Sequence, residues 1–89
     1  MKHYNIKVSG RVQGVFYRAS TRDKAMEFGV KGWVRNEPNG TVYIEAEGPR
    51  EKLDQFIDWC KQGPTHANVE NVHYEVGEVV GFEGFEVRR

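Results

Sequence analysis

The stretch from Gly10 to Arg18, written GRVQGVFYR, holds residue types suited to binding an anion. Gly10 and Gly14 allow backbone conformations that a Cβ atom forbids, so main-chain N–H groups can approach a bound group closely. Arg18 can add a planar, two-pronged contact to a phosphate. In a strand-to-helix loop, such groups converge near the positive end of the helix dipole. From spacing alone, a glycine-rich turn with solvated arginines, Arg11 among them, is an equally good interpretation.

Composition limits the classes of protein that this loop can serve. The chain has 89 residues, enough for one core, so we expect residues 1–89 to form a single domain. Thirteen Lys and Arg balance thirteen Asp and Glu, so no net charge recruits nucleic acid or an anionic membrane. The N-terminus has no apolar run suited to a signal peptide or membrane span, and the single cysteine fits a reducing compartment. We therefore expect a cytoplasmic protein with neither a nucleic-acid nor a membrane partner.

Hydrophobic periodicity predicts the two elements that flank the loop. Residues 4–8 alternate apolar and polar side chains, which indicates a strand with one buried face. Ser20 and Thr21 offer a side-chain cap at the start of a helix, and Gly29 offers a place for it to end. The loop is therefore predicted to join a strand to a helix that begins near residue 20.

A hairpin and a second helix are predicted next. Runs 31–36 and 41–47 have the pattern of strands, and the Asn-Gly pair at 39–40 is the strongest short signal for a hairpin. Pro49 suits the first turn of a helix. The apolar residues of that helix recur on one face, at Leu53, Phe56, Ile57 and Cys60. Cys60 is therefore predicted to be a buried apolar side chain and not a nucleophile.

The remaining elements complete a recognisable plan. Gly63–Pro64 ends the second helix, and the alternating runs 72–76 and 82–87 predict two stretches of strand. The order is that of an α+β, ferredoxin-like split βαβ sandwich (βαββαβ), whose antiparallel sheet carries two helices on one face. RNA-recognition modules share this plan, but Arg35 stands where their sheet motif needs an aromatic residue. The fold alone does not decide a function.

The remaining side chains that could do chemistry form weaker patterns. His3, His66 and His73 lack the spacing of a zinc site, so no metal site is predicted and each is expected to be solvated or to cap an element. Glu45 and Glu47 share a strand face. Alternating surface charges are far commoner there than an acid–base pair, so we expect both at the surface.

Residues 8–18, VSGRVQGVFYR, resemble the signature of the acylphosphatase family. The stretch 32–36, GWVRN, is similar to a second signature of that family in order and spacing. Tyr17 is a mild departure, since many members carry Phe there. The resemblance extends over essentially the whole chain, through Gly40, Val42, Gly48, Gly63, Pro64 and Phe85.

The resemblance implies an enzyme that hydrolyses the carboxyl-phosphate bond of small acyl phosphates to a carboxylate and inorganic phosphate. It implies that Arg18 and Asn36 are catalytic, with Asn36 positioning the attacking water. Asn has no useful pKa, so it would hold the water and not act as its base. The resemblance further implies a monomer that needs no metal and no cofactor. The backbone amides implied to bind the phosphoryl group are those of Gln13, Gly14, Val15, Phe16, Tyr17 and Arg18.

Two alternatives stay open beside this interpretation. One is a non-catalytic phosphate-binding domain, which would have no need of a water-positioning Asn36 beside Arg18. The other is a carbamoyl-phosphate-binding domain, as in the larger hydrogenase-maturation proteins that begin with an acylphosphatase-like unit. Those proteins continue for several domains, whereas this sequence stops at Arg89, so we expect a free-standing enzyme.

Overall fold

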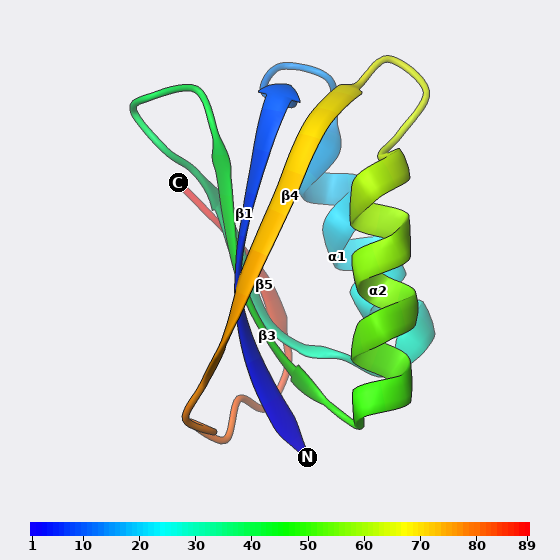
Figure 1. Ribbon diagram of the computed structural model, residues 1–89, viewed down its shortest axis with the longest axis vertical. Coiled ribbons are helices and arrows are strands. Elements are labelled where there is room, and N and C mark those ends of the chain that lie inside the picture. The colour runs from blue at the N-terminus through cyan, green and yellow to red at the C-terminus, as the bar shows by residue number, and fades with distance from the viewer.

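The computed structural model describes residues 1–89, and its chain forms five strands and two helices (Figure 1). Both helices lie on the same face of one sheet. This arrangement confirms the predicted split βαβ plan, with a short fifth strand at its end. The elements in chain order are β1 (Lys2–Arg11), α1 (Tyr17–Phe28), β2 (Lys31–Asn36), β3 (Val42–Gly48), α2 (Arg50–Gln62), β4 (Asn68–Gly77) and β5 (Phe85–Arg88).

The sheet has the strand order β4-β1-β3-β2-β5. The pairs of the first four strands in this order are antiparallel, as predicted. β5 instead runs parallel to β2, from the pair Gly32–Phe85 to the pair Arg35–Arg88, so the sheet as a whole is mixed. β3 lies between β1 and β2, and the loop after β1 is therefore separated from the end of β2 by a strand.

The core lies between the sheet and the helices. Burial alternates along β1, where Tyr4, Ile6 and Val8 are at most 4% exposed. The predicted apolar face of α2 is confirmed, since its buried residues are Leu53, Phe56, Ile57 and Cys60. Burial raises the pKa of the Cys60 thiol to about 12, which keeps it protonated and agrees with an inert core role.

Helix α1 begins earlier than the sequence predicts. Its first residue is Tyr17, and Phe16 stands at the N-cap in a left-handed conformation with no side-chain cap. Thr21 lies one turn inside the helix, where its hydroxyl donates to the Tyr17 carbonyl at 2.7 Å. The predicted cap at Ser20–Thr21 is thus wrong, because the Thr21 hydroxyl bonds back along the helix. As a result Arg18 belongs to the first helical turn.

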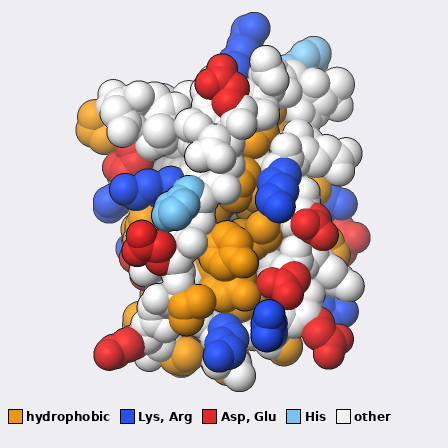
Figure 2. Space-filling model, viewed as in Figure 1, with side chains coloured by type: hydrophobic (Ala, Val, Ile, Leu, Met, Phe, Trp, Pro, Cys, Tyr) orange, Lys and Arg blue, Asp and Glu red, His pale blue; other side chains and the backbone are white.

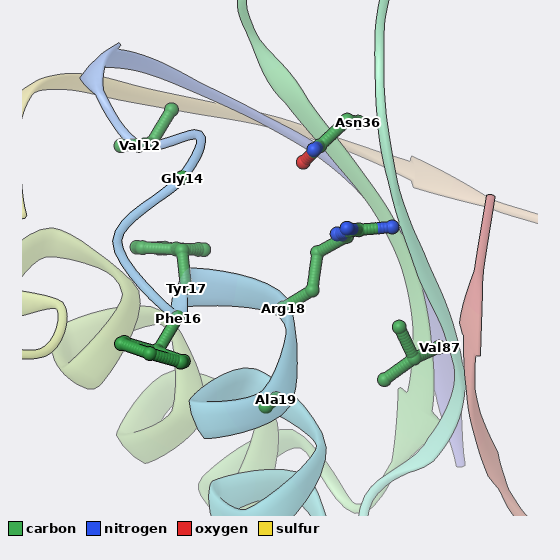
Figure 3. Close-up of a pocket in the computed structure, with 8 residues that line it drawn as sticks. All are labelled: Val12, Gly14, Phe16, Tyr17, Arg18, Ala19, Asn36 and Val87. Atoms are coloured by element: carbon green, nitrogen blue, oxygen red, sulfur yellow. The ribbon is translucent and has the colours of Figure 1, made fainter.

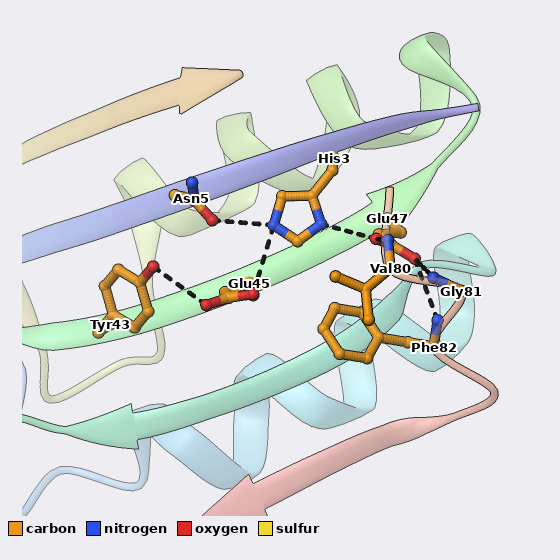
Figure 4. A network of polar contacts seen from close by, with 8 residues as sticks. All are labelled: His3, Asn5, Tyr43, Glu45, Glu47, Val80, Gly81 and Phe82. Atoms are coloured by element: carbon orange, nitrogen blue, oxygen red, sulfur yellow. Dashed lines mark hydrogen bonds and ion pairs between the residues drawn. The ribbon is translucent and has the colours of Figure 1, made fainter. Parts of the chain in front are cut away.

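His3 and Glu47 are buried, at 2% and 1% exposed, so the predictions of a solvated or capping His3 and of a surface Glu47 are wrong. The connection between β4 and β5, residues 78–84, crosses the sheet beside them, and we call it the strap (Figure 4). Glu47 accepts hydrogen bonds from the main-chain N–H groups of three strap residues, Val80, Gly81 and Phe82. It also accepts one from His3 Nδ1 at 2.6 Å. The strap, which is distant from β1 and β3 in the sequence, therefore covers the side chains of His3 and Glu47.

The pKa values of this pair are shifted toward the charged forms. Burial by itself would raise the pKa of Glu47, but the hydrogen bonds from the strap amides and His3 outweigh it and lower the pKa to about 2. Burial would likewise lower the pKa of His3, but its contacts with Glu47, Asn5 and Glu45 outweigh that effect and raise it. Each ring nitrogen of His3 faces an acceptor, Glu47 at 2.6 Å and Asn5 Oδ1 at 2.8 Å, so the protonated imidazole donates to both.

The face shown in Figure 2 carries charged side chains of both signs, interspersed with one another. On the face shown in Figure 2, these charges surround a strip of apolar side chains between β4 and α2. The exposed large hydrophobic residues of β4 are Tyr74 and Val76. Neither α1 nor α2 has the length and the apolar character of a membrane-spanning helix.

Candidate active site

A cavity of about 300 Å³ opens between the start of α1, the loop before it and the end of β2 (Figure 3). Arg18 extends into it from the first turn of α1, and Asn36 faces it from the last residue of β2. β5 contributes one side chain, that of Val87. The lining residues are Val12, Gly14, Phe16, Tyr17, Arg18, Ala19, Asn36 and Val87.

The loop from β1 to α1 owes its shape to left-handed backbone conformations. Gly10, with φ of 118°, follows a break in the β1–β4 register, and a Cβ atom there would lie 2.2 Å from the Asn68 carbonyl oxygen. Gly14 has φ of 73°, and Phe16 is the one non-glycine residue of the chain with positive φ, at 63°. Left-handed geometry costs a side chain such as Phe about 1–2 kcal/mol, so this strain must be held by the surrounding structure.

The amide groups of the loop have no partners within the protein. No main-chain N–H from residue 13 to residue 19 donates a backbone hydrogen bond, and none donates to a side chain. The first N–H groups of any helix lack a partner in the preceding turn. Here they sit at the positive end of a 12-residue helix and border the cavity. Such a set of donors is suited to an anion.

Arg18 is half-buried and is oriented by one hydrogen bond. Its Nη1 donates to the carbonyl oxygen of Arg88 at 3.0 Å, next to Val87 at the end of β5. No carboxylate pairs with it among the ion pairs of the structure. Its charge is therefore not neutralised by the protein, and its other N–H groups can serve a ligand in the cavity.

Asn36 carries the one buried side-chain polar atom of the chain without a partner, its Oδ1. Leaving a buried acceptor unpaired costs about 1–3 kcal/mol, so such atoms are rare in folded proteins. Oδ1 faces the same cavity as Arg18 in Figure 3. An unpartnered acceptor beside unpartnered donors indicates a place for both an anion and a molecule that donates to Oδ1.

The structure brings together most of the residues that the sequence singled out. Gly14, Phe16, Tyr17, Arg18 and Asn36 all line the cavity. The remaining two predicted residues, Gln13 and Val15, do not line the cavity. Val15 is buried in the core, and Gln13 turns its side chain to the β2–β3 hairpin.

Sequence reasoning missed three residues that line the cavity, Val12, Ala19 and Val87. Val12 and Ala19 directly flank the predicted amide-binding residues 13–18, so a window one residue wider at each end would have included them. Nothing local to Val87 marks it, because its place depends on the parallel pairing of β5 with β2.

The side chains of the cavity restrict its chemistry. It contains a guanidinium and an amide but no carboxylate, imidazole or thiol. Elsewhere in the chain, no three His, Cys, Asp or Glu side chains lie together as metal ligands would. The cavity can bind an anion and orient a small molecule, whereas a proton must be taken up by a group that the ligand brings.

Comparisons with known proteins place the sequence and the fold in one family. The acylphosphatase family model matches residues 4–87. An acylphosphatase from Haloquadratum walsbyi is 51% identical over 85 residues, which cover 96% of this chain and 91% of that protein.

Solved structures show the same likeness. The crystal structure of acylphosphatase from Bacillus subtilis superposes with a TM-score of 0.98 at 33% identity, covering all of both chains. Full-length HypF in its phosphate- and nucleotide-bound form gives 0.89 at 25% identity, covering 99% of this chain but 12% of HypF. The chain therefore belongs to the acylphosphatase family and is an enzyme of that class, a hydrolase numbered EC 3.6.1.7.

Proposed function

We propose that this chain hydrolyses the carboxyl-phosphate bond of small acyl phosphates in the cavity at the start of α1. The observation that carries the proposal is the meeting, in one cavity, of a cation without a carboxylate partner and of donors and an acceptor without hydrogen-bond partners. These are the Arg18 guanidinium, the free amides at the N-terminus of α1 and the buried Oδ1 of Asn36. Together they match a phosphoryl group and a water molecule.

The phosphoryl group is bound by Arg18 and by the backbone amides of residues 13–18. The amides point their N–H dipoles at the anion without any side-chain charge, and Arg18 supplies the positive charge. The bond from Arg18 to the Arg88 carbonyl fixes the guanidinium before substrate arrives, so little reorganisation is needed as charge shifts during the reaction.

Asn36 holds the attacking water. Its Oδ1 accepts a hydrogen bond from the water and so aims a lone pair of the water oxygen at phosphorus. An amide cannot remove the proton, since it has no useful pKa. Positioning of this kind is what phosphoryl transfer through a loose transition state mainly requires of a protein.

The reaction balances without any other group. The water oxygen forms a bond to phosphorus as the bond from phosphorus to the acyl oxygen breaks. The electron pair of that bond leaves with the carboxylate, which is already a good leaving group and needs no acid. The water proton passes to a phosphoryl oxygen of the substrate, and the products are a carboxylate and inorganic phosphate.

A phosphate- or carbamoyl-phosphate-binding domain without turnover is the second candidate. The observation that favours it is the likeness to one part of HypF, whose structure contains phosphate and nucleotide. Coverage weighs against it, because this chain covers 91% of the acylphosphatase from Haloquadratum walsbyi but only 12% of HypF.

The test is release of phosphate from benzoyl phosphate in the presence of a metal chelator. We expect the intact chain to turn over, and Arg18→Ala and Asn36→Ala to lose activity while staying folded. Arg22→Ala on the exposed side of α1 and Asn71→Ala on β4 are matched controls that keep full activity.

Binding of inorganic phosphate separates the two roles. We expect it to survive in Asn36→Ala and to weaken in Arg18→Ala. If the intact chain binds phosphate and shows no turnover above background, the binding-domain candidate replaces the proposed hydrolase.

A further inference from the structure

The two catalytic groups of the proposed site are attached to β1 and β2, two strands of the sheet that do not pair with each other. Arg18 and the free amides follow β1, whereas Asn36 ends β2, and β3 lies between those strands. Neighbouring strands are about 4.8 Å apart, so roughly 10 Å of sheet separates the lines of β1 and β2. Direct strand pairing therefore cannot fix the distance between Asn36 and the loop after β1, and another contact between these two segments is needed.

The side chain of Gln13 makes that contact. Its Nε2 donates to the carbonyl oxygen of Glu37 at 2.8 Å and to that of Thr41 at 2.9 Å. These two carbonyls stand on opposite sides of the β2–β3 hairpin, which the Glu37 N–H closes onto Thr41 O at 2.8 Å. One amide nitrogen thus uses both of its protons to tie the loop to both arms of the hairpin.

This tie reaches the two halves of the site through single peptide links. Gln13 directly precedes Gly14, which lines the cavity, and Glu37 directly follows Asn36. The Asn36 side chain has no hydrogen bond within the protein, and its Oδ1 is unpartnered. Its position consequently depends on the main chain at residues 36–37, where Gln13 is attached.

We propose that Gln13 is a positioning residue, whose side chain sets the place of Asn36 relative to the phosphate-binding loop. This role is additional to the use of its backbone amide, and it rests on the proposed function. Because misplacing a reacting group by about 1 Å can cost roughly 100-fold in rate, a tie of this kind acts on kcat. Ground-state binding of phosphate depends on Arg18 and the loop amides, and so is little affected.

The experiment is a double-mutant cycle on benzoyl phosphate hydrolysis with Gln13→Met and Asn36→Ala. Met keeps the length of the side chain and removes both donated hydrogen bonds. We expect Gln13→Met to lower kcat about tenfold or more, while the inhibition constant of inorganic phosphate changes by less than about twofold. In the Asn36→Ala background, the same substitution should change kcat by less than about twofold, since the group it positions is gone.

Controls separate positioning from loss of folding. Gln55→Met on the exposed side of α2 makes the same chemical change away from the site and should leave kcat unchanged. Gln13→Asn keeps the amide but is too short to reach both carbonyls, and should lose part of the rate. Thermal melting of each variant shows that the compared proteins are folded.

A readout that needs no turnover completes the test. The NMR signal of the Asn36 side-chain NH₂ should shift in Gln13→Met and stay in place in Gln55→Met. The proposal is overturned if that signal does not move, if the rate losses multiply in the double variant, or if phosphate binding weakens as much as kcat falls. Absence of turnover in the intact chain would instead reject the proposed function, and the NMR result would still decide whether Gln13 positions Asn36.

Discussion

The buried polar groups at one end of the sheet have hydrogen-bond partners, whereas those at the other end lack them. At the strap end, Glu47 accepts hydrogen bonds from His3 and three main-chain amides, and the protonated imidazole of His3 donates from both ring nitrogens (Figure 4). At the other end, where β2 finishes and α1 begins, Asn36 Oδ1 and the loop amides have no partners, and Phe16 is strained.

This difference indicates that the strap end contributes to stability, whereas the cavity end is suited to binding a ligand. A satisfied buried network holds the chain together, and removing one member leaves the others unpaired. An unsatisfied set weakens the fold and persists where a ligand completes it. Changes at the strap end should therefore reduce stability and spare activity, whereas changes at the cavity should do the reverse.

Glu47→Leu is expected to have the largest effect. It leaves His3 and the amides of Val80, Gly81 and Phe82 without their acceptor, and loss of one partner of a buried pair costs about 3–5 kcal/mol. Urea unfolding measures this loss, with Glu27→Leu on the surface of α1 as the control. Because β5 is also paired with β2, kcat of the folded protein should stay within about twofold, and a large drop would break the comparison.

Arg18→Ala tests the other end. Removing the guanidinium should raise the barrier to hydrolysis by about 3 kcal/mol, or roughly 100-fold in kcat/KM, as for other donors to a developing anion. The melting temperature should change little, because Arg18 makes one hydrogen bond in the protein, to the Arg88 carbonyl. A loss of stability comparable to that of Glu47→Leu would show that the two ends are not distinct.

The His3–Glu47 pair predicts a dependence of stability on pH. The pKa of His3 is raised above 6.5, so its contribution is complete below pH 6.5 and is lost as pH rises through the raised value. The pKa of Glu47 is lowered from 4.5 to about 2, so its contribution is present above pH 4.5 and is lost as pH falls toward 2. The pair thus stabilises most between these limits.

Melting temperatures from pH 2 to 9 test this window. His3→Gln should flatten the decline on the alkaline side, and His73→Gln, at an exposed site on β4, should preserve it. An unchanged alkaline decline in His3→Gln would show that another group controls it.

Phe16→Gly is expected to have the smallest effect and to act in the opposite direction on stability. Glycine relieves the left-handed strain of about 1–2 kcal/mol but adds about 0.5–1 kcal/mol of chain entropy on unfolding. The ring is 79% exposed, so little packing is lost. A net gain of about 0.5 kcal/mol should raise the melting temperature by roughly 2–4 °C, with a severalfold loss of kcat/KM as the loop loosens.

Phe16→Ala serves as the matched variant for this change. It removes the ring and keeps the strained conformation, so its melting temperature should stay near that of the intact chain. If Ala and Gly stabilise the chain equally, the ring and not the backbone angle is the source of the strain.

Local patterns predicted the elements and most of the site. The apolar face of α2 and the antiparallel pairs follow from periodicity, because a repeat of 3.6 or 2 residues fixes which side chains face a core. The boundaries of α1 were less predictable, since Thr21 serves equally well as a cap or as a bond back to a carbonyl within the helix. Chemistry-bearing residues at the loop were identifiable because a motif of glycines and arginine lies within a single short stretch.

What the sequence determined by itself is the set of elements and the family signatures, and it singled out Arg18 and Asn36, which line one cavity. Only the tertiary structure decided that Glu47 and His3 are buried, that β5 runs parallel to β2, and that the Gln13 side chain bonds to the β2–β3 hairpin. The physical reason is the separation along the sequence between the residues that interact. A local pattern specifies how a segment folds, but which charge is covered, and which carbonyl a side chain reaches, depends on segments that are distant in the chain.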